Sequence, residues 1–231
     1  MLKANSFFRY FAHFNIHISM NILILGATGR TGKLVAQMAA GSNHHVTAIV
    51  RNKSRFTMKN VTCIEGSPTD ANLLGKVLKG MDAVVVSLNV NRTSDNPFAK
   101  VVSPLTLISD SVRALITAME QNGVRRIITV SASGVGDSWM DMPLIARLLI
   151  RNSNIMRAYE DHDRQEKLLP GSTLDWTVVR PVMLNNKDNE TYRVPGGKPN
   201  GGGISRKAVA KFILDALESG KYTREFVTIN G

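Results

Sequence analysis

Short apolar runs and segments of helical periodicity alternate along the chain from residue 20 onward. The runs are rich in β-branched residues and have the length of buried strands. They predict seven strands, over 21–25, 46–50, 61–65, 82–88, 126–130, 175–180 and 225–229. Between them apolar residues recur at helical spacing over 32–40, 70–80, 105–123, 156–169 and 205–220.

Glycine ends several of the predicted helices, at Gly80, Gly123 and Gly220, which suits a left-handed C-terminal cap. Strands that are apolar throughout and alternate with helices predict a parallel sheet covered on both faces. We therefore expect a doubly wound α/β fold in a single domain over residues 20–231.

Three segments interrupt this alternation, over 89–103, 131–155 and 183–203. Each follows a predicted strand, and ligands of such sheets lie outside the carboxyl ends of the strands. We expect these segments to be long loops that wall a substrate pocket, with 131–155 and 183–203 inserted as a small C-terminal substrate lobe. The glycine-rich "PGGKPNGGG" within the last segment fits a flexible connector equally well.

Residues 1–19 are aromatic-rich and basic and contain no acidic residue. They fit a transit peptide, a membrane- or partner-binding helix, or an accessory or mis-assigned extension before Met20. Organelle presequences are usually richer in Arg and Ser. We favour the extension and a cytoplasmic location over organelle targeting.

Charge is distributed unevenly along the 231 residues, of which 29 are basic and 18 acidic, for a net charge of +11. Residues 1–64 contain no Asp or Glu, so this part should attract a phosphate-bearing ligand, a nucleic acid or an anionic membrane. The single cysteine, Cys63, excludes an intramolecular disulfide, and its apolar neighbours indicate a core position. No stretch approaches the roughly 20 apolar residues of a membrane span, and no spacing of ligand residues indicates a metal site, so we expect a soluble protein without a metal.

The stretch "ILGATGRTG" at 24–32 follows the first predicted strand and opens a helix. In this context Gly26 permits a tight turn, Gly29 a close approach of the backbone to a pyrophosphate, and Gly32 the packing of helix on strand. The helix N-terminus adds unpaired N–H groups and a positive dipole end. The loop therefore predicts a dinucleotide-binding site.

The loop "GATGRTG" resembles that of the short-chain dehydrogenase/reductase superfamily, in its atypical branches. The similarity extends through "VRNKSR", "GSPTD", "SLN", "DHDRQEKLL" and "VVRP", over nearly all of 20–231, to the NAD(P)H-binding group of NmrA-like proteins and biliverdin-IXβ/flavin reductases. It implies a Rossmann-like fold. It also implies cofactor contacts at Gly26, Thr28, Gly29, Arg30, Thr31, Gly32, Arg51, Arg55, Ser67, Leu88, Asn89, Ser131 and Pro181.

The end of the second strand predicts the choice of cofactor. A carboxylate there binds the ribose of NAD, whereas a basic residue accommodates the additional phosphate of NADP. Arg51 and Arg55 match the positions at which the reductases hold that phosphate, Arg30 can join them, and we expect no acid nearby. We expect NADP(H), with NAD(H) less favoured; the alternative is a solvated basic turn.

The helix over 156–169 lacks the Tyr-x-x-x-Lys pair that most short-chain dehydrogenases use for proton transfer. Tyr159 is followed by Asp163, and in the other register the pair falls on Ala158 and His162. Ser131, Tyr159 and His162 are the candidate catalytic residues. For each there is a structural alternative, in which Ser131 caps a loop, Tyr159 packs and His162 is a surface or satisfied histidine.

Loss of the pair disfavours alcohol oxidation and sugar epimerisation, because both need a positioned base. Hydride transfer to a flavin, a quinone or a linear tetrapyrrole needs no base from the protein, since the acceptor can take its proton from solvent. We expect an NADPH-dependent reductase of such a small-molecule acceptor, as a monomer or weak homo-oligomer, without a nucleic-acid partner. The alternative is a non-catalytic NmrA-like redox sensor.

Overall fold

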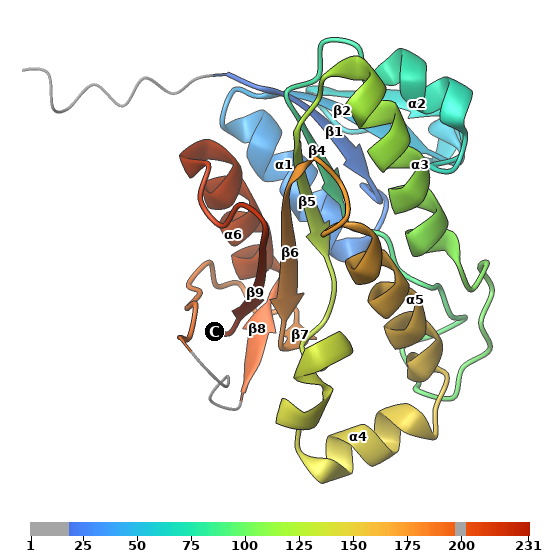
Figure 1. The fold of residues 1–231 in the computed structure, drawn as a ribbon, viewed down its shortest axis with the longest axis vertical. Coiled ribbons are helices and arrows are strands. Elements are labelled where there is room, and N and C mark those ends of the chain that lie inside the picture. The colour runs from blue at the N-terminus through green and yellow to red at the C-terminus, as the bar shows by residue number, and fades with distance from the viewer. Residues whose placement is uncertain (1–18, 197–201) are drawn as a thin grey trace, which may run out of the picture.

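A computed structural model describes residues 19–196 and 202–231 of the chain. Its centre is a sheet of seven parallel strands in the order β3-β2-β1-β4-β5-β6-β9 (Figure 1). The strands are β1 (Asn21–Leu25), β2 (His45–Val50), β3 (Val61–Glu65), β4 (Ala83–Val86), β5 (Arg126–Val130), β6 (Asp175–Pro181) and β9 (Glu225–Ile229). This is the predicted Rossmann-like fold, and its strand order reverses direction between β1 and β4.

Helices cover both faces of the sheet. α1 (Arg30–Gly41) and α6 (Arg206–Ser219) pack on one face, and α2 (Ala71–Val77), α3 (Leu107–Asn122) and α5 (Ile155–Leu168) on the other. Successive side chains of a strand point to opposite faces. Ile22 and Ile24 of β1 accordingly join the first core, and Leu23 and Leu25 the second, which explains why the strands are apolar throughout.

The three glycines expected at helix ends adopt the left-handed conformation. Gly123 and Gly220 are the C-caps of α3 and α6, with φ of 71° and 64°. Gly80 has φ of 75° but lies beyond the C-cap of α2, which is Leu78. Cys63 is buried in the first core, as its apolar neighbours predicted.

The expectation that the three interrupting segments are long loops is wrong in part. The segment 131–155 folds into the 3-10 helix η2 (Gly136–Asp141) and the helix α4 (Leu144–Arg151). The segment 183–203 contributes the parallel pair β7 (Met183–Asn185) and β8 (Gly203–Ser205), and 89–103 is closed by a bridge between Arg92 and Val101. α4 was missed because its eight residues form only about two turns, too few for a clear helical period. η2, α4, β7 and β8 lie at the carboxyl edge of the sheet (Figure 1).

The predictions for the glycine-rich segment and for the N-terminal segment concern residues that are largely outside the described part of the chain. The connector predicted for "PGGKPNGGG" spans 195–203, of which 197–201 lie outside the described residues. The interpretations of 1–19 concern a segment of which only Ser19 is described. Ser19 Oγ donates to the Asn43 carbonyl at 2.7 Å, and the Met20 N–H donates to His44 Nδ1 at 3.1 Å. These bonds fix the entry of the chain into β1.

Candidate functional site

The glycine loop closes tightly between β1 and β4. Gly26 has φ of +92°, and a Cβ placed on it would lie 2.3 Å from the Ser87 carbonyl oxygen. A Cβ on Gly32 would lie 2.2 Å from the carbonyl oxygen of Gly26. Neither position has room for a side chain, because the atoms it would meet are backbone. β4 ends at Val86, earlier than predicted, and the residues that follow it pack on this loop.

The N-terminus of α1 is open beside this loop. Gly29 is the N-cap residue, its N–H donates to the Gly26 carbonyl at 2.9 Å, and no side chain caps the helix. The first turn contains no acidic residue. Thr28, Gly29 and Arg30 are exposed, whereas Thr31 is buried. Free N–H groups and the positive end of the helix dipole make this an anion-binding position.

Arg30 does not point freely into solvent at the start of α1. Its two terminal nitrogens form a bidentate pair with Asp95 of the 89–103 segment, at 2.8 and 2.7 Å. The hydrogen bond and charge of Arg30 lower the pKa of Asp95. The guanidinium is therefore already paired, which the sequence did not indicate.

The turn after β2 presents two unpaired basic side chains. It forms the 3-10 helix η1 (Lys53–Arg55), whose Arg55 N–H is capped by Asn52 Oδ1 at 3.2 Å. The side chains of Arg51 and Arg55 are exposed, and no residue within 19–196 or 202–231 forms a hydrogen bond or ion pair with them. They are free to contact an anionic ligand.

The expectation of no acid near this turn is wrong. Parallel pairing sets Glu65 of β3 beside Val50 of β2, and the Glu65 carboxylate accepts the Lys53 N–H at 2.8 Å. The lack of acidic residues in the first 64 positions did not mean that no acid lies near this turn in the folded protein. Glu65 is the carboxylate that could bind a ribose here.

The remaining predicted contacts lie at the same sheet edge, in different environments. Leu88 is half-buried and Asn89 exposed in the segment that leaves β4. Ser67 is exposed after β3, and its hydroxyl is bonded to Thr69 Oγ1 at 2.7 Å. Pro181 is buried at the end of β6, and its carbonyl accepts the Ser133 N–H at 3.0 Å.

Ser131 follows β5 with only 5% of its surface exposed. Its N–H donates to the Val179 carbonyl at 2.7 Å, but its hydroxyl has no partner within the described residues. A buried hydroxyl without a hydrogen bond is costly and uncommon. This is consistent with a group that binds a ligand at the sheet edge and does not fit simple loop capping.

Tyr159 lies beside this segment on α5. Its hydroxyl donates to the Ser133 carbonyl at 3.1 Å, and its ring meets Trp139 of η2 edge-on at 6.2 Å. Burial raises the pKa of Tyr159 to about 12. Asp163, four residues later, is paired with Lys167 at 2.6 Å. Among the described residues no cation lowers the pKa of the tyrosine, in contrast to an activated Tyr-Lys pair.

His162 is a buried, satisfied histidine. Its Nδ1 is 2.8 Å from Gln165 Nε2, which also donates to the Val130 carbonyl at 3.1 Å. Burial lowers the pKa of His162 to about 4, so the imidazole is neutral at pH 7. This environment favours the structural interpretation of His162.

Two buried charged groups support the site and were missed from the sequence. Arg180 of β6 forms a bidentate pair with Glu166 of α5 at 3.0 and 2.6 Å, and reaches Asp137 of η2 at 2.7 Å. Asp161 accepts the Ile108 N–H at 2.8 Å, so it caps α3 from a neighbouring helix. These residues stand in "VVRP" and "DHDRQEKLL", which carried the resemblance, but no local signal indicated that the charges are buried.

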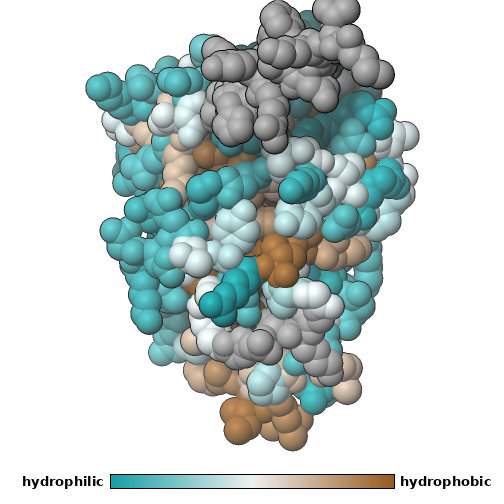
Figure 2. Space-filling model, turned by 90° about the vertical axis from the view of Figure 1, so that its left-hand side faces the viewer, coloured by the Kyte–Doolittle hydropathy of each residue, from teal (hydrophilic) through white to brown (hydrophobic). Residues whose placement is uncertain are grey.

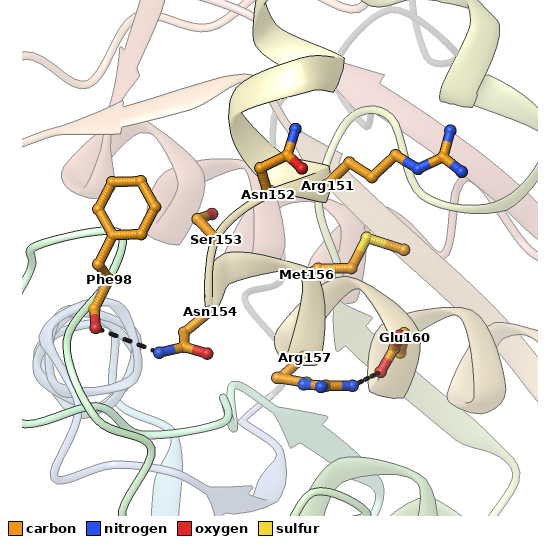
Figure 3. A pocket seen from close by; sticks show the side chains of 8 residues that line it. All are labelled: Phe98, Arg151, Asn152, Ser153, Asn154, Met156, Arg157 and Glu160. Carbon is orange, nitrogen blue, oxygen red and sulfur yellow. Dashed lines mark hydrogen bonds and ion pairs between the residues drawn. The ribbon is translucent and has the colours of Figure 1, made fainter.

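A hollow of about 400 Å³ lies where α4, α5 and the 89–103 segment meet (Figure 3). Phe98 and Met156 are its apolar members, and Arg151 and Arg157 its basic ones. The residues that line it come from the 89–103 segment, α4, α5 and the turn between these helices, and none belongs to the glycine loop.

Within the described residues, no helix is long and apolar enough to cross a membrane. The same residues contain no group of three or more His, Cys, Asp or Glu side chains that could hold a metal ion.

Comparisons with known proteins agree with this geometry. A model of an NAD(P)H-binding family matches residues 26–220. An uncharacterized protein of Bacillus subtilis, YwnB, is 26% identical, with 91% of this chain and 98% of that protein covered. Among solved structures, ChuY, an anaerobillin reductase from Escherichia coli O157:H7, superimposes with a TM-score of 0.74 at 19% identity, over 91% of this chain and 96% of that chain. A short-chain dehydrogenase/reductase of Veillonella parvula in complex with NADP gives 0.72 at 21% identity, over 93% and 95%.

Proposed function

Because the chain belongs to the NAD(P)H-binding family, we propose that it is an NADPH-dependent reductase of a flavin, a quinone or a related conjugated acceptor. The observation that carries the proposal is the environment of Tyr159. An aspartate stands four residues after Tyr159, where the dehydrogenases have a lysine, and the Tyr159 hydroxyl donates to the Ser133 carbonyl at 3.1 Å, so this environment does not favour Tyr159 as the base of an alcohol dehydrogenase. The chemistry that remains is hydride transfer without a protein acid or base.

The residues at the sheet edge fit a dinucleotide. Gly26 and Gly32 permit the tight turn, because neither has room for a side chain. The exposed Gly29 allows the backbone to approach a pyrophosphate, and the open start of α1 supplies N–H donors. Arg51 and Arg55 are free to hold the additional phosphate of NADP. The neighbour from Veillonella parvula that was solved with NADP has the same fold, which is consistent with this choice.

A bound nicotinamide supplies the hydride. The Ser131 hydroxyl would hold the carboxamide or an acceptor oxygen, because it directly follows β5 and, like that of Thr129 within the strand, is buried without a partner among the described residues. Tyr159 and Trp139 would form an aromatic wall for the acceptor. The acceptor would take its proton from solvent, since His162 is neutral and the Tyr159 hydroxyl is bonded to a carbonyl.

We further propose that the segments 131–155 and 183–203 form the substrate lobe. Both follow strands that end at the site, and ChuY, which has this fold, is described as a reductase. We propose the cytoplasm as the location, since a single buried cysteine suits a reducing compartment.

The second candidate is a dinucleotide sensor. The same absence of an activated acid or base favours it, because a sensor must bind NADP(H) without turning over an acceptor. Its occupancy would be passed to a partner protein through the inserted segments. Binding and turnover measured on one preparation separate the two functions.

The test is NADPH oxidation with free flavins and quinones, on wild type and Tyr159→Phe. Loss of a general acid typically lowers turnover by roughly 10²- to 10⁴-fold. We expect Tyr159→Phe to lose less than about tenfold, because its hydroxyl transfers no proton. Tyr222→Phe is the control, since Tyr222 lies between α6 and β9, outside the segments proposed to form the site.

Two results would contradict the proposal. A fall of 10² or more specific to Tyr159→Phe would return this residue to proton transfer. Tight NADPH binding without oxidation by any acceptor would favour the sensor.

A further inference from the structure

The helix α4 presents its apolar side chains to solvent. Leu144 and Ile145 are 62% and 82% exposed, and Leu148 and Leu149 one turn later are 51% and 48% exposed. The side chain that α4 buries fully is Ile150. A surface helix of a globular protein normally shows the opposite arrangement, with its apolar stripe toward the core.

The exposed side chains of α4 belong to a larger apolar surface. Met140 of η2, immediately before the helix, is 70% exposed, and Phe98, which lines the hollow at the end of α4, is 63% exposed. Figure 2 shows hydrophobic surface gathered at the lower end of the molecule, the end at which Figure 1 places α4. We call Phe98, Met140, Leu144, Ile145, Leu148 and Leu149 the α4 surface. Contiguous exposed apolar surface of this kind marks an interaction site.

The unpaired charge beside the α4 surface is positive. Residues 142–159 contain Arg147, Arg151 and Arg157. Asp141 and Glu160 border this range, but neither carboxylate is free. Arg151 is exposed and has no hydrogen-bond or ion-pair partner among the described residues, whereas Arg157 is paired with Glu160 at 3.3 Å. The nearby Asp137 on η2 is paired with Arg180. The charge available to a partner is therefore positive.

We propose that the α4 surface docks on an anionic lipid membrane. Apolar side chains beside arginines are the pattern by which short amphipathic helices enter the interface of a bilayer, with the apolar face among the acyl chains and the cations at the headgroups. Leu144, Ile145 and Leu148 insert, and Arg151 lies at the level of the phosphates. In the neighbouring hollow Met156 lies beside this arginine, and Phe98 lines the opposite side (Figure 3).

The charge pattern argues against a second copy of the chain as the occupant. A two-fold interface centred on α4 would bring Arg147 and Arg151 of two chains together, and the flanking carboxylates of Asp141 and Glu160 already have partners. An anionic surface has the complementary charge. The membrane contact does not depend on which acceptor the site reduces, and it places η2 and α4 at the membrane.

The experiment is flotation of the full-length protein with vesicles of phosphatidylcholine, or of phosphatidylcholine containing phosphatidylglycerol. We expect binding to the anionic vesicles, weakened by high salt because the arginine contribution is screened. Leu144→Glu combined with Ile145→Glu should lower the partition coefficient at least tenfold. Val194→Glu is the control, since Val194 is also exposed and lies next to the bridge between Arg193 and Asn230, beside β9.

Three outcomes would overturn the membrane assignment. The double variant retains residues 1–18, so equal binding by wild type and double variant would assign the membrane contact to another part of the chain and overturn the proposal. So would failure of wild type to bind either vesicle. A dimer in sedimentation that the double variant abolishes would show that a second copy covers α4, which also overturns it. NADPH affinity should be the same in every variant, which separates this test from that of the proposed function.

Discussion

Removal of the two free arginines after β2 tests the choice of cofactor. Arg51→Ala combined with Arg55→Ala should remove the preference for NADPH over NADH and leave NADH affinity nearly unchanged. The reason is that the pyrophosphate would still contact the glycine loop and the start of α1, neither of which changes. Both side chains are exposed and unpaired in the described part of the chain, so their loss should not disturb the fold.

The expected loss of NADPH affinity depends on how exposed the two arginines are. A hydrogen bond to a charged group contributes about 1.5 to 3 kcal/mol when it is protected from solvent. Arg51 and Arg55 are exposed, so water and salt screen them, and about 1 kcal/mol each is the appropriate figure. The sum of about 2 kcal/mol corresponds to about 30-fold in affinity.

Titration of NADPH and NADH into wild type and the double variant, at one fixed salt concentration, measures this preference. Lys76→Ala combined with Lys79→Ala is the matched control, because it removes two exposed positive charges from α2 and the residues after it. It should leave the ratio of the two affinities unchanged.

Three results would refute the reasoning. Equal wild-type affinities would mean that the basic turn is only solvated. A double variant that still prefers NADPH would mean that another group, such as Arg30 after release from Asp95, selects the cofactor. A wild-type preference for NADH would identify Glu65 as the ribose-binding carboxylate.

Two further predictions concern buried groups that support the site. Glu166→Gln should lower the free energy of unfolding by about 3 kcal/mol in urea titrations, because it leaves the buried Arg180 with Asp137 as its remaining acidic partner. The control Glu160→Gln removes one partner of an exposed pair and should change the free energy of unfolding by less than about 0.5 kcal/mol. A loss below about 1 kcal/mol in Glu166→Gln would contradict the role of the buried pair. His162 binds a proton at about pH 6.5 in the unfolded chain but at about pH 4 when folded, so the unfolded state binds more protons between these values and stability falls as the pH falls through this window. The difference between the two pKa values corresponds to about 3 kcal/mol of stability at most. His162→Gln should therefore lose less stability than wild type between about pH 6.5 and 4. Identical profiles of unfolding free energy against pH in the two proteins would show that His162 does not contribute.

Much of the fold followed from local pattern. Hydrophobic periodicity and turn residues act over a few positions, so the strands around Leu23, the left-handed glycines and the core position of Cys63 were all correct from the sequence. The glycine loop was also predictable, because the steric demand at Gly26 and Gly32 arises within one strand–turn–helix unit. The absence of the Tyr-x-x-x-Lys pair could be recognised from residue spacing within one predicted helix.

The tertiary structure decided what surrounds these residues. Glu65 reaches the basic turn through the pairing of β2 with β3, and Arg30 meets Asp95 across 65 positions of sequence. Neither contact leaves a periodic signal, since each joins residues that are distant along the chain. The outward apolar face of α4 was equally invisible, because composition gives the apolar residues of a helix but only packing against its neighbours determines which of them remain exposed.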